Sequence, residues 1–192
     1  MIIKILHFPK DYINIIYLAG RNCYGLSCIH KDTSEQTKKS FVNKIVNNQH
    51  FSVLEHINIT IFIKNASRSF LTQLTRHRLA AYSVKSQHFV LHKNFKHKLL
   101  ENSSMKTEYK ILMNQINTFY NLAIENGMER YIAREVLPNS TLTNIVMTAN
   151  IREYIHIIKL RESSNNTPEI RKFAFILRKL YEQIIPEVFL YI

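Results

Sequence analysis

The sequence predicts an α+β fold in which helices pack on a twisted antiparallel sheet. Its clearest strand is the segment 57–64, INITIFIK, where isoleucine occupies every second position, as in a strand with one buried face. Its clearest helix is 105–124, where apolar residues recur every three or four positions before Gly127. The chain has no internal repeat and no low-complexity linker, so a single domain, 1–192, is expected.

Three elements are expected before the segment 57–64. Residues 2–8 are rich in isoleucine and predict a first strand. Asp11 is expected to cap a helix that ends near Gly20. Ser34 is expected to begin a second helix, whose apolar side contains Phe41, Val42 and Ile45.

A third helix is expected to end in three consecutive donors, Arg76, His77 and Arg78. Its buried side is predicted from the helical spacing of Phe70, Leu71 and Leu74. On a helix, Arg76 and Arg78 would point to nearly opposite sides and could serve two ligand groups. The plainer alternative is a solvated basic helix end that complements the helix dipole. Residues 86–91 are expected to return as a strand.

Four further elements are expected in the C-terminal part. Residues 128–136 predict a short helix ended by Pro138, and residues 141–148 predict a strand. Asn150 is expected to cap the next helix. Thr167, followed by Pro168 and Glu169, is expected to begin the last helix.

The formal charge of +12 favours anionic partners. The basic run 93–98, KNFKHK, could contact phosphate or single-stranded nucleic acid, but a solvated loop is the favoured interpretation. No apolar run approaches the length of a membrane span, and the N-terminus has no signal-peptide pattern. A cytoplasmic protein that does not bind membranes is therefore expected.

Several kinds of site lack the residues that they need. Cys23 and Cys28 provide neither a disulfide framework nor a zinc-site spacing, and no two of the nine histidines have a recognised ligand spacing, so no metal is expected. Three glycines exclude a Rossmann fingerprint and a P-loop, so side chains and helix ends must bind any dinucleotide. Four histidines are expected at the surface or half-buried: His7, His30, His92 and His97.

Four separated blocks resemble one enzyme family. Arg76-His77-Arg78 is followed after seven residues by Ser86, and the string HFSVLEH (50–56) precedes it. The strings AREVLP (133–138) and TANIREYIHIIKLR (148–161) follow it. In this order the blocks resemble the flavin-dependent thymidylate synthases over about residues 2–189. The resemblance implies that family's single-domain fold and a homotetramer whose active sites are shared between subunits.

The family's reaction is the reductive methylation of dUMP to dTMP. The resemblance implies 5,10-methylenetetrahydrofolate as the methylene donor, reduced FAD as the hydride donor and NADPH as the usual reductant of the flavin. All these ligands are anions, so the positive charge fits them as well as it fits nucleic acid, which is not expected as a partner. The alternative is a catalytically impaired relic of this fold, a basic protein that binds nucleotide or nucleic acid.

The resemblance also assigns site residues. Arg161 matches the arginine that polarises the pyrimidine ring; without the other blocks, a helix-end cation paired with Glu162 or Glu169 would be the favoured interpretation. The residues that match dUMP-binding positions are Gln73, Arg76, Ser86, Gln87, His88, Arg134 and Arg161. The residues that match FAD-binding positions are Ser52, Arg76, His77, Arg78, Asn150, Arg152 and His156.

Some of these assignments have plainer alternatives. Asn150 could be only a helix cap, and His156 only a half-buried histidine. Ser86 has no evident neighbouring base in the sequence, so it is assigned to substrate binding and not to covalent catalysis.

Two features depart from the family pattern. His88 stands where the family usually has an arginine that binds phosphate, and losing that charge-assisted contact is expected to cost about 1.5–3 kcal/mol of nucleotide binding unless a neighbour such as Lys85 compensates. The segment 163–171, SSNNTPEIR, replaces a common pattern that ends in Gln-Trp-Glu-Ile. Both departures bear on activity more than on fold.

Overall fold

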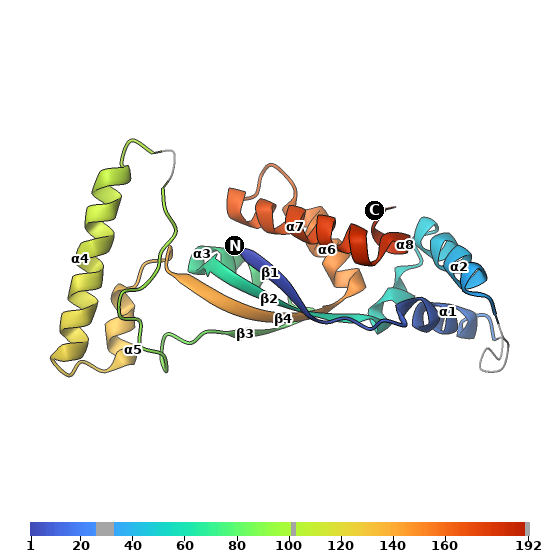
Figure 1. Cartoon of the computed structure of the whole chain (residues 1–192), viewed down its shortest axis with the longest axis horizontal. Helices are drawn as coiled ribbons and strands as arrows, with labels where there is room; N and C mark the ends of the chain where they lie inside the picture. Colours follow the sequence, from blue (N-terminus) through green and yellow to red (C-terminus); the bar gives the residue numbers. More distant parts are fainter. Residues whose placement is uncertain (26–32, 101–102, 191–192) are drawn as a thin grey trace. The chain divides into compact units, whose positions relative to one another are not determined.

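A computed structural model describes residues 1–25, 33–100 and 103–190 (Figure 1). One sheet contains four strands in the order β1-β2-β4-β3, and it is antiparallel, as predicted. The strands are β1 (Ile2–His7), β2 (Asn58–Ser67), β3 (Ala80–Val84) and β4 (Leu142–Asn150). Ile57, just before β2, and Ile59, Ile61 and Ile63 within it are fully buried, which confirms the face predicted from their alternation.

The chain folds into two compact units. Unit 1 comprises residues 1–2, 63–74 and 83–145, and unit 2 comprises residues 3–62, 75–82 and 146–192. The division falls inside β2, β3 and β4 and not at a linker, because each of these strands has residues in both units. The single domain stays a prediction.

Unit 2 contains most of the buried core. Its helices are α1 (Tyr12–Asn22), α2 (Glu35–Asn47), the 3₁₀ helix η1 (Phe51–His56), α6 (Ile151–Arg161), α7 (Pro168–Ile184) and α8 (Pro186–Phe189). Helix α6 contacts η1 and α7, and at the second contact the Tyr154 ring meets the Tyr181 ring edge-on at 5.1 Å. The hydroxyl of Tyr154 also donates to the carbonyl of Ile59 at 3.2 Å, so α6 is joined to β2 by a buried hydrogen bond.

Unit 1 has a smaller core. Its helices are α3 (Arg68–Leu74), α4 (Lys106–Glu125), α5 (Arg130–Ala133) and the 3₁₀ helix η2 (Arg134–Val136). Tyr120 of α4 is fully buried with Ala123 and Ala133, and its hydroxyl accepts a hydrogen bond from the backbone N–H of His92 at 3.1 Å. His92 is itself only 5% exposed, so the prediction of a surface or half-buried position was wrong.

Most of the predicted helix boundaries are confirmed. The Ser34 hydroxyl accepts from the backbone N–H of Thr37, and the Asn150 side chain accepts from that of Glu153, so both residues cap their helices. Gly127 has a positive φ of 82° just after α4, the conformation that a glycine at a helix end supplies. Thr167 is the N-cap of α7, with Pro168 in the first turn.

The predictions at α1 hold in position. Asp11 occupies the N-cap position, although its side chain makes no capping hydrogen bond, and the helix ends two residues past Gly20, at Asn22. Gly20 has a packing role instead, because a Cβ atom there would lie 2.6 Å from the Phe41 ring and 2.7 Å from Ile45. Glycine lets α1 and α2 approach closely; it does not end the helix.

Two boundaries around the Arg-His-Arg triplet also differ from the prediction. Helix α3 ends at Leu74, so the three donors lie in the turn that follows it and not in its last turn. The next strand is Ala80–Val84, whereas residues 86–91 form turns. The reason lies in Ser86, whose hydroxyl accepts from the backbone N–H groups of His88 and Phe89 and so holds the chain in a turn.

The run 93–98 is a loop, as predicted, with an isolated bridge between His97 and Thr141. Its lysines are exposed and Phe95 is buried. No helix among the described residues combines the length and apolarity needed to cross a membrane. Cys23 is exposed. Cys28 and His30 lie outside the described residues.

Candidate active site

His77 is the buried member of the Arg-His-Arg triplet. It is 4% exposed, whereas Arg76 and Arg78 on either side are exposed. The hydroxyl of Tyr82 donates to the carbonyl of His77 at 2.9 Å and fixes the turn that contains all three residues. The helical geometry predicted for the two arginines was wrong; the turn directs the histidine inward and leaves both guanidinium groups in solvent.

His77 lies between a carboxylate and a guanidinium group. Its Nδ1 atom is 3.3 Å from Oε1 of Glu153, and its Nε2 atom is 2.9 Å from Nε of Arg161. Because the arginine nitrogen can only donate, the Nε2 atom of His77 must accept and the ring proton must be on Nδ1. That proton faces Glu153, so Glu153, His77 and Arg161 form a continuous chain of hydrogen-bonding groups, which we call the Glu-His-Arg chain.

Burial and charge both keep His77 neutral. Burial, with the nearby Arg161 and His156, lowers the pKa of His77 from 6.5 to about 4. Burial raises the pKa of Glu153, which is 5% exposed, while His156 acts in the opposite direction. A neutral imidazole with one defined tautomer is what the acceptor role toward Arg161 requires.

Arg161 is held at two of its nitrogens. Besides the bond from Nε to His77, its Nη1 atom donates to Oδ1 of Asn166 at 3.2 Å. Asn166 belongs to the segment 163–171 that departs from the family pattern, and its amide nitrogen donates to the Leu160 carbonyl at 2.8 Å. The departing segment therefore supplies a support for the arginine. Glu162, one plainer partner considered for Arg161, binds Arg178 through both carboxylate oxygens.

The residues that match FAD-binding positions all belong to unit 2. The His156 ring lies edge-on to the His77 ring at 5.7 Å, and Arg152 forms an ion pair with Glu55. Asn150 caps α6 through its side-chain oxygen, so it has the helix-capping role that was considered as the plainer alternative to FAD binding. Ser52 is exposed on η1, and no interaction that joins it to the other members of this set is recorded among the described residues.

The residues that match dUMP-binding positions are divided between the units. Arg76 and Arg161 belong to unit 2, and the others belong to unit 1: Gln73, Ser86, Gln87, His88 and Arg134. The His88 ring stacks near Tyr131 at 5.8 Å, and both line a cavity of about 440 Å³. Lys85 lines a different hollow from His88, and whether it compensates for the missing arginine stays a prediction.

Arg68 is a site candidate that sequence reasoning missed. Its Nη2 atom donates to the Lys85 carbonyl at 2.6 Å, while its Nε atom is buried without a hydrogen-bond partner. Burial, and then the nearby Arg134, lower the pKa of Arg68. Two neighbouring guanidinium groups repel each other, so an anion is favoured beside them. The available signal was a lone arginine directly after the clearest strand.

Glu153 and Asn166 were also missed. Glu153 stands three residues after Asn150, which is the spacing of a capping box and suggests only a helix-end role. In the structure the carboxylate is buried against His77 instead. Asn166 belongs to the segment that departs from the family pattern, so no motif identified it.

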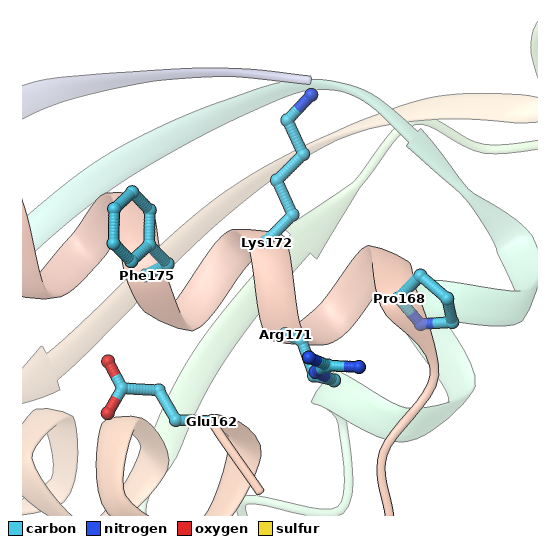
Figure 2. A pocket seen from close by; sticks show the side chains of 5 residues that line it. All are labelled: Glu162, Pro168, Arg171, Lys172 and Phe175. Carbon is cyan, nitrogen blue, oxygen red and sulfur yellow. The ribbon is translucent and has the colours of Figure 1, made fainter. Parts of the chain in front are cut away.

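A further cavity of unit 2 contains none of the assigned residues. It has a volume of about 560 Å³ and is lined by Glu162, Pro168, Arg171, Lys172 and Phe175 (Figure 2). Lys172 and Phe175 extend from one side of α7, and the Arg171 side chain lies below Pro168. Within residues 1–25, 33–100 and 103–190, no three His, Cys, Asp or Glu side chains group closely enough to hold a metal ion.

The chain is similar to known proteins over nearly its whole length. A family model described as "Thymidylate synthase complementing protein" matches residues 4–187. The flavin-dependent thymidylate synthase of Geobacter sulfurreducens is 32% identical over 198 aligned residues, which cover 98% of the chain and 85% of that protein. The enzyme of the same name from Mycobacterium tuberculosis H37Rv is 31% identical, with 91% of the chain and 77% of that protein covered.

A solved structure shares the fold. Thymidylate synthase X from Helicobacter pylori, crystallised with FAD and dUMP, superposes with a TM-score of 0.82 over 98% of the chain and 97% of that protein's chain, at 22% identity. This likeness confirms the predicted fold class.

Proposed function

The chain belongs to the flavin-dependent thymidylate synthase family, and from this premise we propose that it is the methyltransferase that converts dUMP to dTMP. The Glu-His-Arg chain is the observation that carries the proposal. It holds a protonated guanidinium group by two nitrogens at the end of α6, with a neutral histidine behind it. Such a group is suited to a reaction in which negative charge develops on a pyrimidine ring.

Arg161 is the catalytic residue in this proposal. A guanidinium group stays protonated at any physiological pH and presents its donors in one plane, so it can meet the edge of a pyrimidine ring and stabilise negative charge there. His77 and Asn166 restrict the rotation of the side chain, so less conformational entropy is lost when the ring arrives. Arg161 makes carbon 5 of the ring more nucleophilic without a covalent bond to the enzyme.

The hydrogen-bond donors of unit 2 are suited to the phosphates of FAD. Arg76 and Arg78 are exposed, and no ion pair of either is recorded among the described residues. Asn150 begins α6, whose first backbone N–H groups and dipole favour a phosphate. Bound FAD, once reduced, supplies the hydride. The chain's own residues, Ser52, Arg152 and His156 among them, would bind and orient that cofactor.

Arg134 and Arg68 would bind the nucleotide phosphate. Their side chains are half-buried, which strengthens a charge-assisted hydrogen bond compared with the same bond in water. The Ser86 hydroxyl oxygen already accepts two backbone N–H groups, and within the described part of the chain no hydrogen bond from it to a basic side chain is recorded. Ser86 therefore shapes the loop that contains Gln87 and His88, which agrees with a binding role and not with a nucleophilic one.

The remaining parts of the proposal rest on the family alone. They are NADPH as the reductant, 5,10-methylenetetrahydrofolate as the methylene donor, a homotetramer with shared active sites, and a cytoplasmic location.

The visible spectrum tests the proposal against the impaired relic. The purified protein is mixed with FAD, freed of unbound cofactor and titrated with NADPH without oxygen. Retained flavin absorbance that bleaches, and bleaches faster with dUMP present, supports an enzyme. A protein that retains no FAD but binds oligonucleotides in a strongly salt-dependent way would favour the relic.

A further inference from the structure

Unit 1 contains a hollow that none of the assigned residues lines. Its volume is about 300 Å³, and its walls come from the end of β2, the segment after β3, the loop 91–96 and the start of β4. Four lysines belong to these walls: Lys64, Lys85, Lys93 and Lys96. We call this feature the lysine hollow.

The charge of the lysine hollow is entirely of one sign. Its lining includes four ammonium groups and no carboxylate. One of the four, Lys93, has an acidic partner, the exposed Glu125 at 3.5 Å. For Lys64, Lys85 and Lys96, no ion pair is recorded within the described part of the chain. Cations gathered around one concave space raise the local concentration of anions and bind a polyvalent anion best.

A buried hydroxyl also lines the hollow. Thr143 of β4 is 2% exposed, and its Oγ1 atom has no hydrogen-bond partner. A buried hydroxyl without a partner is costly, by about 1–3 kcal/mol. Because Thr143 lines the hollow, an oxygen-rich ligand that reaches its hydroxyl would satisfy it and add a polar contact to the charge.

The walls have a defined shape. Asn65 and Asn94 adopt positive φ angles of 60° and 52°, and each is held by a hydrogen bond: the Asn65 N–H donates to Asn144, and the Asn94 side chain accepts from Asn117. His92 beside them is buried, and its pKa is lowered by burial and then by Lys85 and Arg68, against a hydrogen bond to Ser86.

We propose that the lysine hollow binds the diphosphate or triphosphate group of a free nucleotide. Lysines act as point charges and suit phosphate, whereas a carboxylate is better matched by the fork of an arginine. A volume of about 300 Å³ corresponds to roughly ten water molecules, which is more than a single phosphate needs and about what a chain of two or three phosphates occupies. This site is distinct from the residues assigned to dUMP and lies beyond the proposed reaction.

Calorimetry with inorganic tripolyphosphate tests the proposal. The titration uses the FAD-saturated protein with saturating dUMP, so the substrate site is occupied. The double variant Lys64→Gln/Lys96→Gln removes two charges from the hollow. The control Lys106→Gln/Lys110→Gln removes two exposed charges from α4 in the same unit. Thr143→Val keeps the shape of the side chain and removes the hydroxyl.

The expected result is a Kd at least 10-fold weaker for the hollow variant, 3- to 10-fold weaker for Thr143→Val and within 2-fold of the wild type for the control. Equal weakening in both lysine pairs would show a general surface-charge effect and would overturn the proposal. No binding by the wild type in the presence of saturating dUMP would also overturn it. So would a single-stranded oligonucleotide that binds more tightly than tripolyphosphate and is lost in the same variants. Because no turnover is measured, these outcomes do not depend on the methylation reaction.

Discussion

The role of Glu153 provides the sharpest mutational test, because no family motif suggested it. In Glu153→Leu, the Nδ1–H group of His77 loses its acceptor. A hydrogen bond to a charged group is worth about 1.5–3 kcal/mol. This hydrogen bond keeps the His77 proton on Nδ1, so that Nε2 can accept from Arg161. If the transition state loses stabilisation of this size, kcat/KM falls by about 10- to 150-fold.

Stability should change much less than activity. Leucine leaves a buried donor unpaired, but it also removes a buried carboxylate whose desolvation opposes folding, so the two effects offset each other. Glu153→Gln retains an oxygen that can accept from Nδ1 and should recover kcat/KM to within about 5-fold of the wild type. Tyr154→Phe removes the neighbouring buried hydroxyl of α6 without contact to His77, and it should lose about 1 kcal/mol of stability and little activity.

The assays are steady-state dTMP formation at varied dUMP and equilibrium unfolding in urea. The expected pattern is a lower kcat for Glu153→Leu, with KM for dUMP changed by less than about 3-fold. If folded Glu153→Leu retains wild-type kcat/KM, the positioning role of Glu153 is wrong. If both variants lose activity in proportion to their stability, Glu153 is only a structural residue.

Four other predictions concern further residues of the candidate site. The pKa of His77 is lowered from 6.5 to about 4 in the folded state, so the unfolded chain binds this proton first as the pH falls. At about 1.4 kcal/mol per pH unit, the free energy of unfolding of the wild type should fall by about 3 kcal/mol more than that of His77→Gln between pH 6.5 and pH 4. Urea unfolding at each pH measures this difference. Glu153, whose pKa is raised by burial, opposes this trend in the wild type. Long-range ¹H–¹⁵N NMR at pH 7 should show the His77 proton on Nδ1; a proton on Nε2 would contradict the Glu-His-Arg chain. His88→Arg should lower KM for dUMP by about 10-fold in steady-state assays, by restoring a charge-assisted contact, and an unchanged KM would show that position 88 does not face the phosphate. Asn166→Ala should lower kcat by about 3- to 10-fold, whereas the exposed Asn165→Ala should not; equal rates would remove Asn166 from the site.

Regular hydrophobic patterns predicted the fold well. The alternating isoleucines of β2 have one solution that buries them all, and the caps at Ser34 and Asn150 are local hydrogen bonds that need no tertiary information. The triplet region was harder, because no glycine or proline follows Leu74 to indicate where the helix ends. The observed strand Ala80–Val84 shows only weak alternation of apolar and polar residues. The turn found where a strand was predicted, at 86–91, depends on the hydroxyl oxygen of Ser86.

The site residues could be predicted only within the four sequence blocks that resemble the family. Arg161 and His77 were identified by resemblance, but their mutual bond joins residues 84 positions apart and cannot be seen in a local pattern. From the sequence, Glu153 could complete a capping box at the start of α6 or contact a buried side chain. Its burial beside His77 in the folded chain shows the second. Arg68 became a candidate because Arg134 is near enough to lower its pKa, and this proximity exists only in the folded chain.

Formation of dTMP in a single turnover tests the proposed reaction most directly. The FAD-loaded protein is reduced with NADPH under anaerobic conditions, mixed with dUMP and methylenetetrahydrofolate, and quenched for chromatography. The wild type should form dTMP as the flavin is reoxidised, while Arg161→Ala should bind FAD and accept electrons but form little or none. A wild-type flavin that is reduced normally yet yields no dTMP, or an Arg161→Ala variant as fast as the wild type, would contradict the proposed reaction.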